Sequence, residues 1–353
     1  MTIQSTTSSP GANSLANPEQ MVAVCGASGH TGRFVVSELC RRGWAPILCG
    51  RDAAKLNAVG EMHPGSEVRV ASVDDPVSLD RAVAGAVAII NCAGPFIDTA
   101  ARIIEAAIRA RIHYFDVTAE QAVVLDIFER FAAEARDAGI VVAPAMAFYG
   151  GLGDLLATAA MGDWPAADEI LIAVALDSWN PTSGTRLTGK RHPGRRFVFS
   201  NNRLEFLADP PPRRAWNFPE PFGIQDVVGL GFSEIITISR HLWVPEIHAF
   251  MNLAPITDIR NPDTPGPVAV DGSGRSSQTF LMEVIARRGS EERRAVARGR
   301  DIYAITAPIV VEATHRAVNQ LARTTGVVPA GEVFDARDFL KSLSPTPLSI
   351  EIQ

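Results

Sequence analysis

Short apolar runs alternate with longer amphipathic stretches from Met21 onward. Six runs have the length expected of strands, and they are residues 21–26, 45–50, 67–72, 87–92, 113–117 and 140–145. The first four have the Val and Ile content of strands that are buried on both faces. Between them, helices are predicted by the spacing of apolar positions or by a capping residue, over 31–42, 52–59, 98–110 and 119–138. This alternation predicts parallel strands joined by right-handed helical crossovers, which is an α/β doubly wound sheet.

The pattern changes after residue 148. We expect a helix over 152–161, a strand over 169–176 and an antiparallel hairpin formed by 277–289 and 293–307. A last helix is expected over 308–323. The predicted organisation is a disordered tail (1–20), a Rossmann domain (21–148), an α+β substrate and dimerisation domain (149–307), and a C-terminal helix and tail that pack back on the Rossmann domain (308–353).

Charge and composition exclude several classes of protein. The 353 residues suffice for two domains, and 33 Lys and Arg against 39 Asp and Glu give a net charge of -6, without the basic surplus of a nucleic-acid binder. No apolar run reaches the ~18 residues that cross a bilayer. Residues 1–20 match neither a secretory signal nor a transit peptide, and the four cysteines lack CxxC spacing. We expect a cytoplasmic protein with reduced, buried thiols and no nucleic-acid or membrane partner.

A glycine-rich loop connects the first strand with the first helix, and its sequence is Gly26-Ala27-Ser28-Gly29-His30-Thr31-Gly32. Glycines allow a tight turn close to a pyrophosphate, and the helix start offers unpaired N–H groups to negative charge. The loop therefore predicts dinucleotide binding by Gly26, Ser28, Gly29, His30, Thr31 and Gly32.

The second strand ends in Cys49-Gly50-Arg51-Asp52, where an acid would select NAD and a cation would select NADP. Arg51 can hold a 2'-phosphate with two hydrogen bonds, which favours NADP, although Asp52 leaves NAD possible. At the end of the fourth strand, Ala93-Gly94-Pro95 lies next to the predicted topological switch point, where small residues let a flat ring lie against the backbone.

Four segments together resemble the saccharopine dehydrogenase-like family: GASGHTGR at residues 26–33, GRDAAKL at 50–56, Asn91 to Phe96, and Tyr114 to Glu120. The similarity is greatest to the short bacterial members that include trans-acting enoyl reductases, and Ser183-Gly184-Thr185 is similar to a Gly-Thr motif found there. The resemblance implies NADP(H) binding, a second domain whose sheet covers the substrate cleft, and a set of residues near the nicotinamide: Cys92, Ala93, Gly94, Pro95, Phe96, Thr118 and Glu120. The chain departs from the family at Ser72-Val73, near the adenine, where many relatives carry an acid.

A nicotinamide carries the hydride chemistry, so the protein has to supply placement and a proton source. The Tyr-x3-Lys pair of short-chain dehydrogenases is excluded, because Tyr114, Tyr149 and Tyr303 are followed at that spacing by Thr118, Gly153 and Ala307. The seven histidines show no metal-binding motif, so no metal site is expected. The candidate proton donors are Tyr149, Tyr114, His113 and water. Tyr149 either faces the reacting centre or packs between the domains.

Two features of the second domain leave alternatives open. The cationic stretch from Thr188 to Arg196 either attracts an anionic substrate or forms a solvated loop. The second domain contains many large aromatic side chains, which predict a core and a roomy apolar pocket. These side chains are Trp164, Trp179, Trp216, Trp243, Phe197, Phe199, Phe218 and Phe222.

These expectations combine into an NADP(H)-dependent reductase that transfers a hydride to a C=C, C=N or C=O bond of a small hydrophobic substrate. One alternative is a dinucleotide-binding sensor without turnover. Another, suggested by the family resemblance, is reductive amination with two substrate carboxylates held by Arg186, Arg191, Arg195 or Arg203. Edges of the second sheet make a homodimer plausible.

Overall fold

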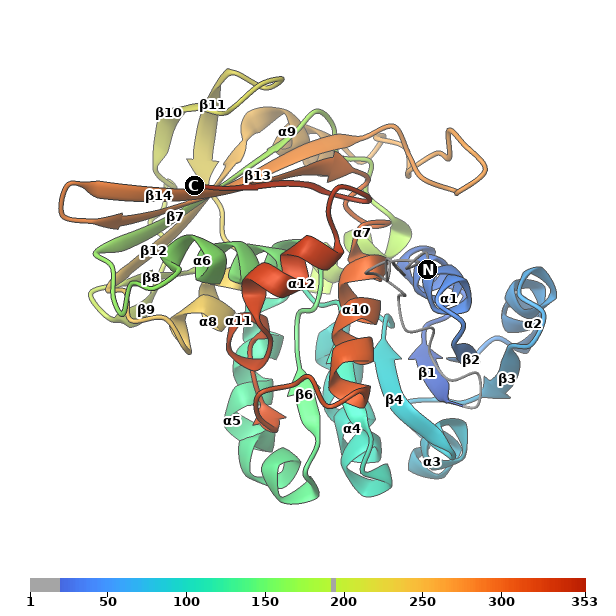
Figure 1. The fold of residues 1–353 in the computed structure, drawn as a ribbon. Coiled ribbons are helices and arrows are strands. Elements are labelled where there is room, and N and C mark those ends of the chain that lie inside the picture. Colours follow the sequence, from blue (N-terminus) through green and yellow to red (C-terminus); the bar gives the residue numbers. More distant parts are fainter. Residues whose placement is uncertain (1–19, 192–194) are drawn as a thin grey trace, which may run out of the picture.

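The computed structural model describes residues 20–191 and 195–353, so the predicted tail over 1–20 lies almost wholly outside the described residues. The chain forms two sheets with helices packed around and between them (Figure 1). The first sheet is parallel and has the order β15-β6-β5-β4-β1-β2-β3. Six of its strands correspond to the predicted runs: β1 (Met21–Cys25), β2 (Ala45–Gly50), β3 (Glu67–Val70), β4 (Ala86–Asn91), β5 (His113–Asp116) and β6 (Val141–Ala143). The doubly wound Rossmann architecture is confirmed.

Helices cover both faces of this sheet. The predicted helices are present as α1 (His30–Arg41), α2 (Ala53–Met62), α4 (Phe96–Ala110) and α5 (Gln121–Ala138). The pattern analysis missed α3 (Pro76–Val83), although its start is signalled by Asp75, which accepts hydrogen bonds from the N–H groups of Val77 and Ser78 at 3.1 and 3.2 Å. It also missed β15 (Gly326–Val327), because two residues carry no periodicity.

The second sheet is mixed and has nine strands. Its main path is β10-β11-β12-β7-β13-β14-β16, and β8 pairs with both β12 and β9. The strands are β7 (Glu169–Leu176), β8 (Phe197–Ser200), β9 (Arg203–Phe206), β10 (Arg213–Asn217), β11 (Ile224–Gly229), β12 (Glu246–Asn252), β13 (Thr279–Arg288), β14 (Glu291–Arg300) and β16 (Ser349–Ile352). The predicted strand over 169–176 and the predicted hairpin are present as β7 and β13-β14.

The hairpin ends earlier than the pattern suggested. β14 stops at Arg300, and the buried carboxylate of Asp301 accepts backbone hydrogen bonds from Ser276, Tyr303 and Ala304 at 2.7 to 3.0 Å. These bonds hold a turn that leads into α10 (Thr306–Val318), which begins and ends before the predicted 308–323.

The remaining helices fill the space between the two sheets. A π-helical turn (Phe148–Leu152) leads into α6 (Gly153–Met161), which packs on β13 and β14 (Figure 1). The others are α7 (Ser183–Arg191), α8 (Glu234–Ser239), α9 (Leu253–Arg260), α11 (Ala330–Val333) and α12 (Ala336–Ser342). None of the described helices is long and apolar enough to cross a membrane.

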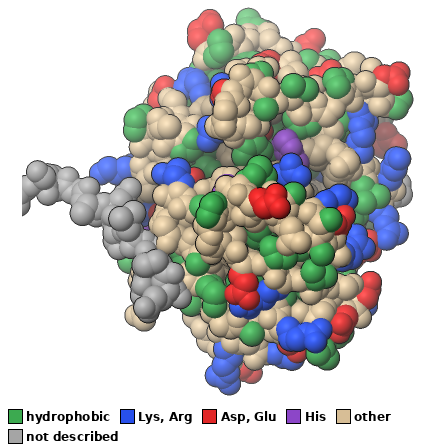
Figure 2. Space-filling view, turned by 90° about the vertical axis from the view of Figure 1, so that its right-hand side faces the viewer, with side chains coloured by type: hydrophobic (Ala, Val, Ile, Leu, Met, Phe, Trp, Pro, Cys, Tyr) green, Lys and Arg blue, Asp and Glu red, His purple; other side chains and the backbone are tan. Residues whose placement is uncertain are grey.

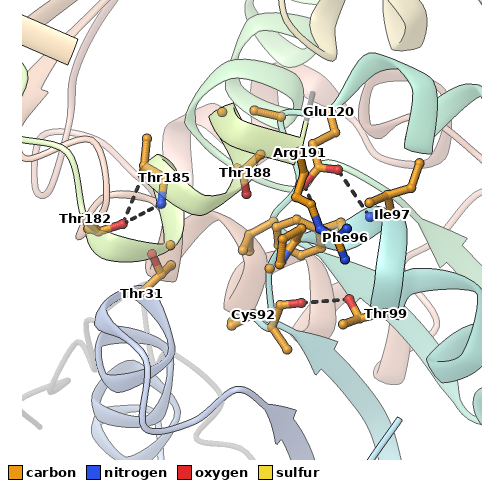
Figure 3. A pocket seen from close by; sticks show the side chains of 18 of the residues that line it. Thr31, Cys92, Phe96, Ile97, Thr99, Glu120, Thr182, Thr185, Thr188 and Arg191 are labelled. Atoms are coloured by element: carbon orange, nitrogen blue, oxygen red, sulfur yellow. Dashed lines mark hydrogen bonds between the residues drawn. The ribbon is translucent and has the colours of Figure 1, made fainter. Parts of the chain in front are cut away.

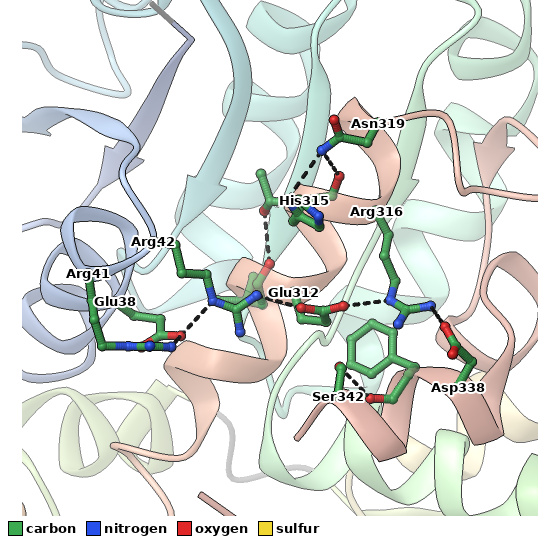
Figure 4. A network of polar contacts seen from close by, with 12 residues as sticks. Glu38, Arg41, Arg42, Glu312, His315, Arg316, Asn319, Asp338 and Ser342 are labelled. Carbon is green, nitrogen blue, oxygen red and sulfur yellow. Dashed lines mark hydrogen bonds and ion pairs between the residues drawn. The ribbon is translucent and has the colours of Figure 1, made fainter. Parts of the chain in front are cut away.

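A charged network holds the C-terminal helices on the first domain (Figure 4). Glu312 of α10 is buried and pairs with Arg42, next to α1, and with Arg316, which in turn pairs with Asp338 of α12 at 2.8 Å. Arg42 also pairs with Glu38 of α1 at 2.7 Å. The C-terminal segment contributes β15 to the first sheet and β16 to the second sheet. Its helix α10 packs on α1.

Candidate functional site

The glycine loop turns sharply between β1 and α1. Gly26 has φ +78°, and a Cβ at this position would lie 2.9 Å from the backbone nitrogen of Ala93, so the end of β1 approaches the end of β4 as only glycine allows. A Cβ on Gly32 would lie 2.2 Å from the carbonyl oxygen of Gly26, so α1 also packs closely against the loop. Within the described loop, no side chain caps the first turn of α1. Its N–H groups are therefore available to an anion.

A cavity of about 1380 Å³ extends from this loop to the second sheet. Most of the predicted cofactor residues line it, together with Tyr149: Gly26, Ser28, Gly29, His30, Thr31, Arg51, Val73, Cys92, Ala93, Gly94, Pro95 and Glu120. Figure 3 shows Thr31 of α1 and Phe96 of α4 on different sides of this space, with Thr182, Thr185 and Thr188 from the α7 region above them. The space-filling view shows basic and acidic side chains interspersed over one face of the molecule rather than separated by sign (Figure 2).

Three predicted cofactor residues do not line the cavity. Gly32 serves the close packing of α1 on the loop, as its distance to Gly26 shows. Ser72 is held by Ser78, whose hydroxyl oxygen accepts a hydrogen bond from the Ser72 N–H at 3.0 Å. Thr118 is fully buried, and its hydroxyl oxygen accepts a hydrogen bond from the N–H of Glu120 at 3.1 Å. Their contribution to cofactor binding would be indirect.

The end of β2 presents a cation to the cavity. Arg51 is exposed, and among the described residues no hydrogen bond or ion pair engages its guanidinium group. The neighbouring Asp52 is engaged locally, because it accepts a hydrogen bond from the Lys55 N–H at 3.1 Å and pairs with the Lys55 ammonium group at 3.0 Å. Since Asp52 caps α2, Arg51 is the side chain here whose charge is left for a ligand.

Glu120 shapes the wall beside Gly94 and Pro95. Its carboxylate accepts hydrogen bonds from the backbone N–H groups of Phe96 and Ile97 at 2.9 and 3.2 Å, the first residues of α4 (Figure 3). A carboxylate at a helix N-terminus is stabilised by the helix dipole. Glu120 therefore fixes the start of α4 next to the cavity.

Tyr114 lies in the interior of the first domain and does not line the cavity. Its hydroxyl donates a hydrogen bond to Asp116 at 2.9 Å, and Asp116 also accepts the N–H groups of Thr118 and Ala145 at 3.0 and 2.8 Å. Burial raises the pKa of Asp116 to about 6 despite these hydrogen bonds. The hydrogen bonds of Asp116 with Tyr114 and Ala145 tie β5 to the segment after β6. The buried position of the Tyr114 hydroxyl does not fit the catalytic role predicted for this residue. His113 also lies outside the cavity lining, where its ring accepts the N–H of Val141 at 3.0 Å.

Tyr149 lies in the π-helical turn and faces the cavity. Its ring stacks on Phe232 with 4.0 Å between centroids, and the side chain is buried. The hydroxyl has no hydrogen-bond partner among the described residues. Burial raises the pKa of Tyr149 well above its usual range, and nearby Tyr303 and Glu234 raise it further, so the phenol remains protonated at neutral pH. The ring therefore packs between the domains and its hydroxyl is unsatisfied, and the position of Tyr149 at the reacting centre stays a prediction.

Tyr303 connects residues from several parts of the cavity lining, which the sequence analysis did not predict. Its hydroxyl accepts the indole N–H of Trp179 at 3.0 Å and bonds with the hydroxyl of Thr185 at 2.9 Å. Its ring meets the edge of His30 from the glycine loop at 5.4 Å between centroids. These residues lie far apart in the chain, so no local pattern links them. Thr185 belongs to the Ser183-Gly184-Thr185 motif, which was the available signal.

The aromatic side chains predicted for the second domain divide between cavity and core. Trp179 and Phe197 line the cavity, while Trp216 donates a hydrogen bond to buried Glu283 at 2.6 Å on another face of the sheet. Trp243 is exposed. The predicted aromatic side chains therefore do not all serve the cavity.

The arginines within and near the cationic stretch from Thr188 to Arg196 have different surroundings. Arg191 pairs with Asp98 at 2.7 Å, which connects α7 with α4 beside the cavity (Figure 3). Arg186 donates to the carbonyl oxygens of Asn261 and Thr264, and Arg203 pairs with Glu205 away from the cavity. Residues 192–194 of this segment lie outside the described part of the chain. Of the four arginines named for two substrate carboxylates, Arg191 and Arg195 line the cavity, and Arg186 and Arg203 do not.

A parallel sheet with a glycine loop, a helix start open to an anion, and a cavity covered by a second sheet define a two-domain dinucleotide-binding protein. Residues 26–127 match a family model described as NAD(P)H-binding. Among metal-ligand residue types in the described ranges, no group of three or more could hold a metal ion.

Comparisons with known proteins extend this classification. The chain is 27% identical over 139 residues to a saccharopine dehydrogenase-like oxidoreductase of Bos taurus, covering 34% of this chain and 32% of the relative. It is 28% identical over 136 residues to a lipid droplet localized protein of Caenorhabditis elegans, covering 35% and 32%. The matched part is thus about a third of the length of these curated relatives.

The fold similarity covers nearly the whole chain. Saccharopine dehydrogenase (L-Glu forming) from Saccharomyces cerevisiae superposes with a TM-score of 0.68 at 12% identity, over 95% of this chain and 100% of the yeast chain. Together the matches confirm the resemblance to saccharopine dehydrogenase-like proteins, and the family model supports NAD(P)H binding by residues 26–127.

Proposed function

We propose that the protein is an NADP(H)-dependent reductase acting on a C=C, C=N or C=O bond of a small, largely hydrophobic substrate. The observation that carries this proposal is one cavity that reaches from the glycine loop and Arg51 to the unpartnered hydroxyl of Tyr149. A candidate cofactor site and a candidate proton donor therefore share one cavity.

The residues present fit a dinucleotide. The loop from Gly26 to Thr31 would hold the pyrophosphate against the start of α1, and Ala93 to Pro95 would support the nicotinamide end. Arg51 would hold a 2'-phosphate, because its charge has no partner among the described residues and Asp52 caps α2 instead of facing a ribose hydroxyl. This arrangement favours NADP over NAD.

A reduced nicotinamide supplies the hydride when it is bound. The chain's own contribution is the proton, for which Tyr149 is the proposed donor. Its phenol is buried and protonated, and a buried hydroxyl without a partner costs about 1–3 kcal/mol, which a substrate oxygen or nitrogen would offset by accepting its hydrogen bond. The ring of Tyr149 packs against the rings of Phe232 and Trp179, with 4.0 and 6.1 Å between centroids.

Titration of the purified protein with NADPH and NADH tests the cofactor assignment. We expect NADPH to bind at least about tenfold more tightly, since one charge-assisted contact contributes about 1.5–3 kcal/mol. A panel of apolar enones, imines and ketones, followed by the absorbance of the reduced cofactor, then tests turnover. Tighter binding of NADH would refute the NADP assignment, and binding without turnover of any of the three bond types would favour the dinucleotide sensor.

The oligomeric state and the compartment remain predictions. A homodimer would show in sedimentation as twice the mass of the chain, and fractionation of cells would test the cytoplasmic location.

A further inference from the structure

Among the described arginines that line the cavity, Arg196 is the one that is not exposed. Arg196 precedes β8, is partly buried and lines the cavity. Its Nη1 donates a hydrogen bond to the carbonyl oxygen of Gly231 at 2.9 Å, and its guanidinium carbon lies 4.3 Å from the ring centroid of Phe232. In the described ranges, no carboxylate lies within ion-pair distance of it, whereas Arg191 pairs with Asp98.

The acidic side chain whose charge acts on Arg196 is Glu234, and this charge does not fully neutralise the guanidinium group. One carboxyl oxygen of Glu234 accepts the N–H of Phe232 at 2.8 Å, and the other is buried without a partner among the described residues. Burial raises the pKa of Glu234 to about 7, so this group is only about half ionised near neutrality. Burial also lowers the pKa of Arg196, but a guanidinium group remains charged in proteins. Among the described residues Arg196 thus has no ion-pair partner and is only partly compensated by Glu234, so an anionic ligand would stabilise it.

Phe232 connects this cation with the proposed proton donor. Tyr149 stacks on Phe232 at 4.0 Å and Arg196 lies at 4.3 Å from the same ring, so the two must occupy opposite faces of it, because one face has room for one such partner. The cavity wall around this stack is apolar and includes Trp179, Phe197, Leu230 and Ile256.

We propose that Arg196 is the substrate-anchoring residue of the cavity and that it binds the single carboxylate of an amphiphilic substrate whose apolar body lies along the surrounding wall. This inference rests on the proposed function for the position of the reacting bond, but the anion site itself can be tested without the cofactor. It narrows the substrate class from any hydrophobic compound to a monocarboxylic acid.

The number of charges favours one carboxylate over other anions. Arg196 is one cation with one nitrogen already bonded to Gly231, which leaves donors for a single two-oxygen acceptor. A phosphate would bring a second negative charge close to Glu234. A dicarboxylate would require a second arginine that is shielded from water, and the other described arginines of the lining are exposed, among them Arg191, which pairs with Asp98, and Arg195, which lies 4.8 Å over the exposed ring of Phe206.

Calorimetric titration with four eight-carbon probes at neutral pH tests this assignment. The probes are octanoate, octanamide, octyl phosphate and octanedioate, each with the full chain alone and again with saturating NADPH. We expect octanoate to bind about 10-fold to 100-fold more tightly than octanamide, the range given by one charge-assisted contact. Octyl phosphate and octanedioate should bind more weakly than octanoate.

Three variants assign the preference to the residue. Arg196→Leu should remove the preference for octanoate over octanamide, and Arg196→Lys should retain part of it because the charge remains. Arg203→Leu is the matched control, since Arg203 pairs with Glu205 outside the cavity, and it should bind all probes like the wild type. NADPH affinity and the unfolding midpoint show that each variant is folded; if Arg196→Leu fails this check, the lysine variant and the probe series decide.

Equal affinities for octanoate and octanamide would overturn the proposal, as would a preference that persists in Arg196→Leu. Tighter binding of octyl phosphate or octanedioate would overturn the monocarboxylate class. If NADPH does not bind but the apoprotein prefers octanoate through Arg196, the anion site is supported and the proposed reductase fails instead.

Discussion

Replacing Gly32 by alanine tests the geometry of the nucleotide loop. Alanine normally favours a helix over glycine by up to about 1 kcal/mol, so propensity alone predicts a more stable protein. The structure predicts the opposite, because the new Cβ would lie 2.2 Å from the carbonyl oxygen of Gly26 and 3.0 Å from the Cα of Ala27. Both contacts are with backbone atoms, which cannot rotate away.

The size of the effect follows from the displacement needed. A contact of ~3.2 Å requires α1 to move by about 1 Å, and overpacking of this kind costs about 1–3 kcal/mol. After a propensity gain of about 1 kcal/mol is subtracted, we expect Gly32→Ala to be less stable than the wild type by up to about 2 kcal/mol. The same shift moves the N–H groups of α1 away from the pyrophosphate. Loss of one charge-assisted hydrogen bond would weaken NADPH binding at least about tenfold.

Urea unfolding and fluorescence titration with NADPH measure the two effects. Gly60→Ala in α2 is the matched control, because its Cβ would meet Val68 and Leu48 side chains at 3.5 and 3.7 Å, which are ordinary contacts. This control should gain about 0.5–1 kcal/mol and keep its NADPH affinity. If Gly32→Ala is as stable as the control and binds NADPH like the wild type, the account of the loop is refuted.

Three further substitutions test other parts of the site and the fold. Arg51→Leu should weaken NADPH binding about 10-fold to 100-fold and leave NADH binding within about twofold, by the same fluorescence titration; equal losses for both would contradict the 2'-phosphate assignment. Tyr149→Phe should lower kcat about 10²-fold or more while NADPH affinity is kept, and an unchanged kcat would remove Tyr149 as proton donor. Glu312→Gln should destabilise the protein by about 2 kcal/mol or more, because Arg42 and Arg316 lose their shared anion. Burial raises the pKa of Glu312, but the two arginines lower it by more, so the pKa in the folded state is below the unfolded value of about 4.3. The stabilisation by Glu312 is therefore present above the unfolded pKa and is lost as the pH falls through the folded pKa. Urea unfolding at a series of pH values should show this loss in the wild type and not in Glu312→Gln.

Much of the first domain could be predicted from the sequence because its signals are local. A buried parallel strand is a continuous apolar run, and the loop after β1 needs glycine at Gly26 whatever the rest of the chain does. The short strand β15 and the assignment of Tyr114 could not be obtained in this way. β15 is defined by its pairing with β6, and the position of the Tyr114 hydroxyl depends on Asp116 and on which side of β5 it faces.

The sequence by itself determined the doubly wound sheet, the nucleotide loop and the cation at Arg51, since each depends on residues adjacent in the chain. Only the tertiary structure decided which side chains share the cavity. Tyr149, Arg196 and Phe232 come from three separate segments, and their contacts depend on how the second sheet lies over the first. The physical reason is that burial and charge compensation are properties of the packed environment, so a lone arginine or an unpartnered hydroxyl is recognisable only when everything around it is in place.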